Sequence, residues 1–342
     1  AGPFTLAEWV PNDRVVFKKW AGYGGWNPVQ KTKGPVAIDQ LTIRWIGEGA
    51  VLGNIVKSGN AHVGFTIPAS FVDEYKNDKS VTFISKDQSG TGLQMVMNIR
   101  KPPLNDIRVR RALHHAADQA AINKLLFDGY YAPSEGPLNN NHRCFWDGAG
   151  KMYERSVDKA KALLDQAGWK VVAGKPIREA QGVAGVADGT PLKIRYNVLH
   201  HKEIGEALQA QFRRAGVDLA VEVLAGPVQL DRVNKRDFDL MYERQRSPDP
   251  VILDQVWNSK WDQPGGWAWT GFKDDTLDAT LGKLRALPSL DDRCAAARDA
   301  QKIIMENALM LPTLSDPAFV VVSGKVKGFQ MGAEGNWFYV NN

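Results

Sequence analysis

Two pairs of adjacent histidines are the residues whose type first suggests metal chemistry. His114 precedes His115 in a helical stretch. The second pair, His200 and His201, comes shortly before Glu203. A zinc-binding helix brings two imidazoles to one face by placing them four residues apart, whereas neighbours on a helix point about 100° apart. We therefore expect both pairs to be polar surface or capping residues, and we predict no metal site.

Two pairs of aspartates are candidates for general acid and base catalysis. Residues 274–275 and 291–292 are both Asp-Asp. Each pair stands at the start of a predicted helix, where the helix dipole stabilises negative charge. The sequence also lacks the glycine-flanked serine of hydrolases and the glycine-rich loops that hold nucleotides. We therefore predict no catalytic residue and no cofactor, and we expect a protein that is not an enzyme.

Two arginines, Arg244 and Arg246, occupy a loop whose place in the fold follows from the elements before it. Those elements alternate as strand, helix, strand, helix and strand over residues 192–198, 203–215, 219–224, 229–235 and 238–242. This order implies parallel strands joined by right-handed crossovers. Ligands of such open sheets bind beyond the carboxyl ends of the strands, so residues 243–250 should face a cleft.

A second candidate surface is aromatic. Four tryptophans and a phenylalanine stand in a glycine-rich stretch without helical spacing, namely Trp257, Trp261, Trp267, Trp269 and Phe272. Tryptophan supplies much of the contact area at ligand-binding faces, so we expect at least one of these side chains to face a ligand. Core packing is the alternative interpretation for the eleven tryptophans of the chain.

Other elements flank this α/β core. Helices are predicted by apolar periodicity over residues 106–129, 156–168, 275–287 and 291–307, with Asp106 and Ser156 as N-caps of the first two. Short β-rich segments occur towards both ends of the chain, at residues 15–17, 41–46, 62–66, 81–84, 319–322 and 337–340. We expect the two ends to pair in one β-rich lobe around an α/β insertion.

Length and composition set the outer limits. A chain of 342 residues with 44% hydrophobic and 24% charged residues is an ordinary globular chain of about two domains. No stretch is long and apolar enough to span a membrane. The net charge is +5, but lysines and arginines are scattered, so nucleic-acid binding is not favoured. The two cysteines, Cys144 and Cys294, exclude a disulfide scaffold and leave open either one bridge or two separate thiols.

Several stretches carry a family resemblance. Residues 2–11 read GPFTLAEWVP, residues 98–113 read NIRKPPLNDIRVRRAL and residues 158–168 read DKAKALLDQAG. Shorter matches follow at residues 271–278 and 311–329. In this order the stretches resemble motifs of the extracytoplasmic solute-binding proteins of peptide and nickel ABC importers, the dipeptide- and oligopeptide-binding family 5. The resemblance covers essentially the whole chain.

The resemblance implies a two-lobed α/β fold like that of periplasmic binding proteins. One lobe would be β-rich and formed by residues 1–88 and 312–342, and the other would be an α/β lobe formed by residues 89–311. Hinge strands would lie near residues 93–98 and 311–315. The implied function is to capture a small solute between the lobes and deliver it to an ABC permease in the inner membrane. The implied location is the periplasm or a lipid-anchored extracytoplasmic site.

The chain departs from the family in length. It resembles the C-terminal two-thirds of its members, and it opens without an initiator Met or a leader. An absent N-terminal segment would leave strand edges of the β-rich lobe exposed, which favours aggregation unless another segment covers them. We therefore expect a companion fragment of the same protein, either separate or cleaved.

A second departure concerns the ligand. Peptide-binding members resemble one another in placing an Asp four residues before the Pro that follows the third strand, whereas counting back from Pro250 gives Arg246. A guanidinium repels a peptide ammonium and holds a carboxylate or phosphate. The ligand is therefore expected to be anionic rather than an ordinary peptide, unless Arg246 only makes a salt bridge. The predicted ligand-binding residues are Arg244, Arg246, Ser247, Asp249, Trp267, Trp269 and Phe272.

Two other functions compete with solute binding. A carbohydrate-binding or carbohydrate-active protein would also use a Trp-lined cleft, and the active kind would turn over its substrate with two essential carboxylates. A basic nucleic-acid binder would bind with an affinity that falls steeply with salt.

Overall fold

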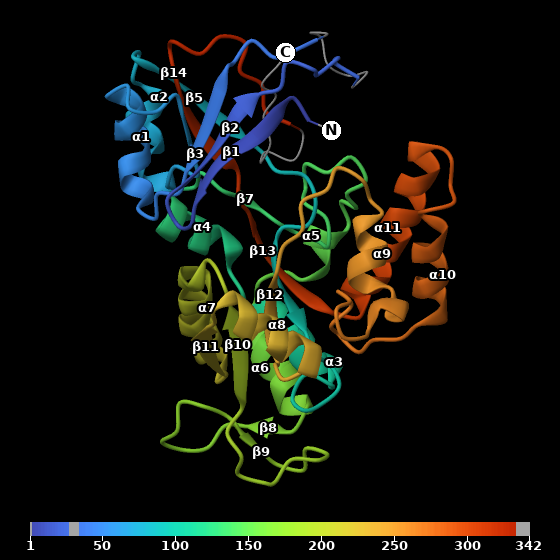
Figure 1. Ribbon diagram of the computed structural model, residues 1–342. Coiled ribbons are helices and arrows are strands. Elements are labelled where there is room, and N and C mark those ends of the chain that lie inside the picture. Colours follow the sequence, from blue (N-terminus) through green and yellow to red (C-terminus); the bar gives the residue numbers. More distant parts are fainter. Residues whose placement is uncertain (1, 27–33, 333–342) are drawn as a thin grey trace. The chain divides into compact units, whose positions relative to one another are not determined.

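The computed structural model describes residues 2–26 and 34–332, and the chain divides into two compact units (Figure 1). Unit 1 comprises Ala1–Gln88 with Pro317–Asn342, and unit 2 comprises Ser89–Asp316. The second boundary follows Asp316 rather than Leu311, because residues 312–315 continue a strand that pairs within unit 2. Helices and several sheets make the architecture α/β, as predicted.

The two ends of the chain meet in one sheet of unit 1. Strand β14 (Ala318–Ser323) pairs antiparallel with β4 (Val63–Phe65) on one side and β5 (Val81–Lys86) on the other. This confirms the expected pairing of early and late β segments, while the strand predicted at residues 337–340 lies outside the described residues. The helical elements of unit 1 are α1 (Gly49–Lys57), η1 (Ala69–Phe71) and α2 (Val72–Lys76).

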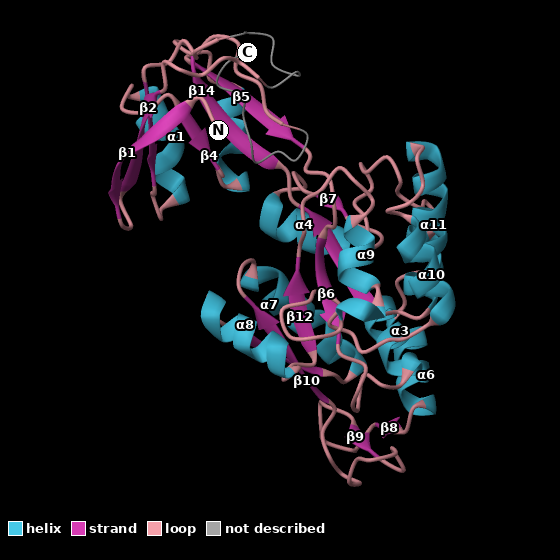
Figure 2. Cartoon of the chain, turned by 45° about the vertical axis from the view of Figure 1, so that its right-hand side comes forward, coloured by secondary structure: helices cyan, strands magenta, loops and turns pink. Residues whose placement is uncertain are grey.

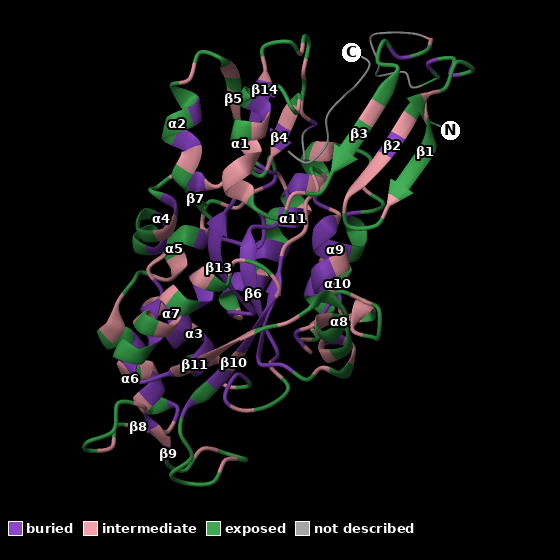
Figure 3. Cartoon of the chain, turned by 60° about the vertical axis from the view of Figure 1, so that its left-hand side comes forward, coloured by how far each residue is buried: buried purple, intermediate pink, exposed green. Residues whose placement is uncertain are grey.

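A second sheet of unit 1 is exposed. Strands β1 (Phe4–Val10), β2 (Arg14–Lys19) and β3 (Gln40–Arg44) form an antiparallel sheet in that order. Most residues of β1 and β3 are exposed or half-buried (Figure 3). The side chains of Trp9 and Leu6 are 68% and 60% exposed. This small sheet therefore presents apolar surface that nothing in the described residues covers.

Unit 2 is built on a six-stranded sheet in the order β11-β10-β12-β6-β13-β7. Figure 2 labels β10, β12, β6 and β7 of this sheet. Strands β11, β10 and β12 are parallel, and β6, β13 and β7 continue the sheet with antiparallel pairings. The bounds are β6 (Leu93–Met97), β7 (Ala132–Pro133), β10 (Lys193–Val198), β11 (Asp218–Val223), β12 (Leu240–Glu243) and β13 (Met310–Ser315). Helices α7 (Lys202–Ala215) and α8 (Gly226–Lys235) connect the parallel strands, which confirms the predicted β-α-β-α-β order.

Side-chain caps fix where the helices of unit 2 begin. Asp106 and Ser156 accept hydrogen bonds from the first-turn amides of α3 (Ile107–Ala116) and α6 (Val157–Gln166), as predicted. The single helix predicted over residues 106–129 is wrong. Ala117 is extended, with ψ 140°, and Asp118 caps a new helix, α4 (Gln119–Phe127), so the chain turns there.

The rest of unit 2 packs around its longest helix. A core cluster joins α9 (Ile252–Trp257), α10 (Asp275–Lys283) and α11 (Leu290–Glu306), and the last two occur where predicted. Cys144 and Cys294 form a disulfide that ties the loop before α5 to α11. The structure thus selects the bridge from the two alternatives. The remaining elements are α5 (Ala149–Met152), β8 (Trp169–Lys170), β9 (Glu179–Ala180) and η2 (Ser259–Trp261).

Candidate functional site

The loop that carries Arg246 is held at the carboxyl end of β12 by backbone hydrogen bonds. The Thr91 amide donates to the Gln245 carbonyl at 2.8 Å, and the Ser247 amide donates to the Ser89 carbonyl at 3.0 Å. Between them Gly90 has a φ of 129°, and a Cβ there would lie 2.7 Å from the Ser247 nitrogen. Only glycine fits this close approach, and it fixes the backbone position of Arg246.

Two guanidinium groups share one carboxylate in this loop. Arg244 forms a short ion pair with Asp316, and the Nη2 atom of Arg246 lies 3.5 Å from an Asp316 oxygen. All three side chains are mostly buried. Burial and the charge of Arg244 lower the pKa of Arg246, and Asp316 opposes that shift. The cluster therefore holds one more cation than anions.

Part of the hydrogen-bonding capacity of this cluster is unused. Within the described part of the chain, the buried Nε of Arg246 and the buried hydroxyl of Tyr242 have no partner. Burial raises the pKa of Tyr242 to about 12, so the hydroxyl keeps its proton. A buried donor without a partner costs roughly 1–3 kcal/mol. These two atoms add to the cost of burying the second guanidinium beside Arg244.

Aromatic rings surround this edge of the sheet. The rings of His200 and His201 lie 6.4 Å and 6.5 Å from that of Tyr242, and Tyr131 stacks on Phe127 at 3.9 Å. Sequence reasoning missed Tyr131, Tyr242 and Asp316 as site residues. His200 and His201 follow β10 directly, and the carboxyl ends of parallel strands lie at one edge of a sheet. This position in the sequence could have predicted that the histidine pair lies near the arginine loop.

The other predicted site residues lie in other environments. Ser247 and Asp249 hydrogen-bond each other, and Asp249 pairs with Arg293 at 2.7 Å, so both are used within the fold. Trp267 is 39% exposed and lines a cavity of about 240 Å³ with Trp261. The lining of this cavity does not include the arginines.

Two of the predicted aromatic residues are half-buried against the core. Trp269 donates its indole N–H to the Gly266 carbonyl at 2.8 Å and packs on the core of unit 2. Phe272 packs on the same core. Their observed contacts are therefore structural, and their predicted role towards a ligand stays a prediction.

The histidine pairs differ from expectation in one respect. His114 is buried rather than exposed, and its ring stacks on Tyr153 with 4.2 Å between centroids. His115 bonds the Glu154 carbonyl, and His201 is the N-cap residue of α7. Among the residues that the structure describes, no group of three or more potential ligands could hold a metal ion.

Glu243, at the end of β12, is buried beside the arginine loop. One of its carboxylate oxygens accepts from Gln94 and Thr91, and the other has no partner among the described residues. Burial raises the pKa of Glu243 to about 7, although the bonds from Gln94 and Thr91 lower it. In the unfolded chain the group titrates near its ordinary value of 4.5.

We predict that Glu243 makes the protein less stable as pH rises from about 5 to 7.5. In this window the unfolded chain has lost the proton that the folded chain retains, so stability falls by up to about 3 kcal/mol and then levels off. The variant Glu243→Gln should lack this fall and exceed the wild type in stability at pH 8. Urea unfolding at several pH values measures the effect, with Glu206→Gln on the surface of α7 as control. The same pH slope in Glu243→Gln and wild type would refute the assignment.

Comparisons with known proteins agree with this fold. The profile of the bacterial extracellular solute-binding proteins, family 5 Middle, matches residues 1–260. The chain is 24% identical over 338 residues to the probable D,D-dipeptide-binding periplasmic protein DdpA of Escherichia coli K12, covering 96% of this chain and 59% of that protein. Thus it spans less than two thirds of that relative.

Solved structures give the same fold. The oligopeptide-binding protein AppA of Bacillus subtilis, in complex with a nonapeptide, superposes with a TM-score of 0.81 at 17% identity, over 99% of this chain and 65% of AppA. NikA of Brucella suis, in complex with Fe(III)-EDTA, superposes with a TM-score of 0.79 at 21% identity, over 98% of this chain and 66% of NikA. In the described residues, no helix is long and apolar enough to cross a membrane.

Proposed function

Because this chain belongs to family 5 of the bacterial extracellular solute-binding proteins, we propose that it is the substrate-binding component of an ABC importer. It captures a small solute outside the cytoplasm and delivers it to a permease in the inner membrane. The periplasmic relative DdpA supports a periplasmic location. Binding and release need no chemical change in the solute, so the ligand is recovered unaltered. Family membership does not favour the carbohydrate or nucleic-acid alternatives.

We propose further that the solute carries a carboxylate or another anionic group. The observation that carries this proposal is the pairing of Arg244 and Arg246 with the single carboxylate of Asp316. A ligand anion would balance the second guanidinium and accept hydrogen bonds from it. The peptide and metal-chelate complexes of AppA and NikA leave the ligand class of this chain open.

The exposed sheet β1-β2-β3 leads to a proposal about partners. Its apolar side chains have no cover among the described residues, and the relatives are longer than this chain. We propose that further polypeptide of the same protein packs on this sheet. Native mass spectrometry of the protein isolated from its source tests the proposed solute binding and the proposed companion polypeptide. It reports bound small molecules as well as any further polypeptide in the particle. A particle with the mass of this chain alone would refute the companion, and a chemically altered ligand would refute simple binding.

We expect Arg246→Ala to weaken binding of the co-purified ligand at least 30-fold. Loss of a charge-assisted hydrogen bond to a desolvated ligand group costs about 2–5 kcal/mol, whereas a surface ion pair contributes about 1 kcal/mol at most. Calorimetry measures the affinity. The matched control is Arg195→Ala. Arg195 lies in the first half of β10, is similarly buried and forms an ion pair with Asp239. An affinity of Arg246→Ala within threefold of wild type would mean that Arg246 serves only the fold.

A further inference from the structure

The arginine loop, residues 244–247, contacts both ends of unit 2. The chain enters unit 2 at Ser89 and leaves it at Asp316. At the entry, the backbone hydrogen bonds described above join Ser89 and Thr91 to the loop. The buried side chain of Thr91 adds to them, because its hydroxyl accepts from the Gln245 amide at 2.6 Å. The first residues of unit 2 are therefore fixed to the arginine loop.

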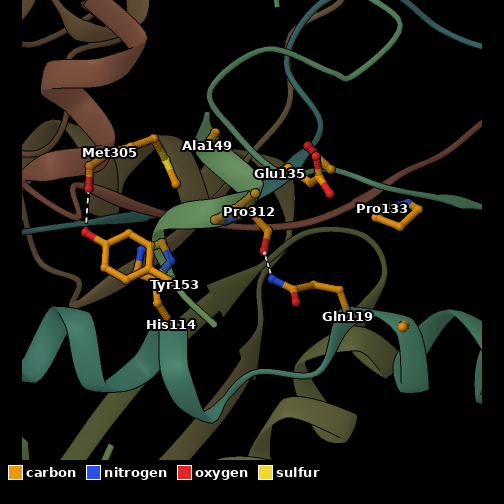
Figure 4. Close-up of a pocket in the computed structure, with 11 residues that line it drawn as sticks. His114, Gln119, Pro133, Glu135, Ala149, Tyr153, Met305 and Pro312 are labelled. Atoms are coloured by element: carbon orange, nitrogen blue, oxygen red, sulfur yellow. Dashed lines mark hydrogen bonds between the residues drawn. The ribbon is translucent and has the colours of Figure 1, made fainter. Parts of the chain in front are cut away.

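At the exit, a firmly held strand leads to Asp316. In β13 the Pro312 carbonyl accepts from the side-chain N–H of Gln119 at 3.1 Å (Figure 4), and the Thr313 hydroxyl donates to the Leu93 carbonyl at 2.6 Å. Asp316 comes directly after β13 and is the last residue of unit 2. Its ion pairs with the two guanidinium groups therefore tie the end of unit 2 to the arginine loop.

The two ion pairs of Asp316 are unequal. Arg244 is hydrogen-bonded to the carboxylate. The Nη2 atom of Arg246 lies 3.5 Å from it, outside the range of about 2.7–3.2 Å that is usual for an N–H···O hydrogen bond. Arg246 is therefore the guanidinium that another anion can take from Asp316, while Arg244 keeps its pair.

A solute anion and Asp316 need the same part of Arg246. The Nε atom of this guanidinium is buried, so an anion from solvent bonds it through the terminal Nη atoms. One of these atoms is the one nearest Asp316. Two carboxylates beside one guanidinium also repel each other, and the repulsion is strong because the groups are mostly buried. Binding of a solute anion therefore competes with the pair of Asp316 and Arg246.

We propose that Asp316 is an internal competitor for the solute anion, and that the solute takes Arg246 from it. This inference rests on the anionic solute proposed above. The exchange leaves the exit of unit 2 with one guanidinium partner instead of two, so the chain at Asp316 becomes freer to move. Coupling of this kind is reciprocal, so Asp316 lowers the affinity for the solute by the factor by which the solute loosens Asp316. Asp316 is therefore a positioning residue that links solute capture to the hinge.

Acetate, a minimal carboxylate, is the probe for this competition. Its affinity is obtained from the melting temperature as acetate replaces chloride at constant ionic strength. We expect Asp316→Asn to bind acetate at least tenfold more tightly than the wild type, because it keeps the shape of the side chain but lacks the competing charge. Adding Arg246→Ala to this variant should abolish the gain. An acetate affinity of folded Asp316→Asn within threefold of the wild type, or below it, would overturn the proposal.

The matched control for this charge change is Asp239→Asn. The side chains of Asp239 and Asp316 are 10% and 11% exposed, and each carboxylate pairs with two cations. The partners of Asp239 are Lys101 at 3.2 Å and Arg195 at 3.5 Å, and the residue directly precedes β12, at the opposite end of the strand from the arginine loop. Its acetate affinity should equal that of the wild type. An equal gain in both variants would indicate a general charge effect and would overturn the proposal.

Hydrogen–deuterium exchange measured by mass spectrometry tests the link to the exit of unit 2. In the wild type, saturating acetate should speed exchange in the peptide 312–318 at least threefold relative to chloride at the same ionic strength. Folded Asp316→Asn should exchange faster there even without acetate, and β11 should be unchanged. Unchanged exchange at 312–318 in the wild type with acetate would overturn the proposal, and this measurement does not depend on whether Asp316→Asn folds.

The outcomes also separate this inference from the proposed function. If Arg246→Ala binds the co-purified ligand like the wild type, the anionic solute is refuted and the inference falls with it. If Arg246→Ala weakens that binding but Asp316→Asn gains no affinity for acetate, the anionic solute stands and the role of Asp316 is refuted.

Discussion

The double variant Cys144→Ala/Cys294→Ala is expected to lose about 3–5 kcal/mol of stability in unit 2. The disulfide closes a loop over a sequence separation of 150 residues, and such a closure removes much conformational entropy from the unfolded chain. Both cysteines are buried in the core cluster that contains α11. Their truncation to alanine adds a small packing loss, because each removes one heavy atom.

Thermal unfolding under oxidising and reducing conditions measures this effect. The wild type should unfold about 6–20 °C lower when reduced, given roughly 2–4 °C per kcal/mol for a domain of this size. The double variant should resemble the reduced wild type and should not respond to the reductant. A double variant that melts within 2 °C of the oxidised wild type would show that the bridge adds no stability.

Asp254→Ala is expected to destabilise unit 2 by about 3 kcal/mol. The Asp254 side chain is fully buried and accepts from four groups at 2.8–3.3 Å, namely Asn258, Lys260, Trp261 and Arg285. These bonds join α9 to η2 and to the segment after α10. Hydrogen bonds to a charged group contribute about 1.5–3 kcal/mol each, but Lys260 and Arg285 are half exposed and regain water when the carboxylate is removed.

Urea unfolding of Asp254→Ala tests this expectation against two references. Asp291→Ala removes a carboxylate whose ion pair with Arg143 is largely exposed, so it should cost less than about 0.5 kcal/mol. Asp254→Asn keeps one acceptor and should fall between the wild type and the alanine variant. If Asp254→Ala and Asp291→Ala unfold at the same urea concentration, the hydrogen bonds of the buried Asp254 carboxylate do not stabilise unit 2 as predicted.

The sequence predicted the parts of the fold that depend on local rules. Ser156 could be predicted as an N-cap because a serine side chain reaches the amide three residues further along the chain. In the structure the Lys159 amide donates to the Ser156 hydroxyl. The alternation of strand and helix patterns from residue 192 to 242 predicted the parallel strands. Apolar periodicity and turn residues are local properties, so they can be read from the sequence. The break at Ala117 was missed, since apolar periodicity continues across it and Asp118 has a capping role only once the chain turns.

The candidate site depended on contacts that no local pattern contains. Arg246 was predicted from the order of strands and from the family resemblance, but its partner Asp316 is distant in sequence and follows β13. His114 was expected on the surface because imidazole is polar, yet the fold buries it and stacks its ring on that of Tyr153. Such pairings arise from the packing of elements, so a single sequence does not reveal them.

The central position of β14 in the sheet β4-β14-β5 has a consequence for synthesis on the ribosome. Strands β4 and β5 leave the ribosome early, but the strand that joins them is made only after residues 87–317. At about 5–20 residues per second, these two strands wait roughly 10–50 s for their partner. Throughout that time their backbone groups are open to pairing with other chains. The sheet of unit 2 is also completed late, because its strand β13 directly precedes β14 in the chain. We therefore expect the early strands of unit 1 to need protection by chaperones until β14 emerges.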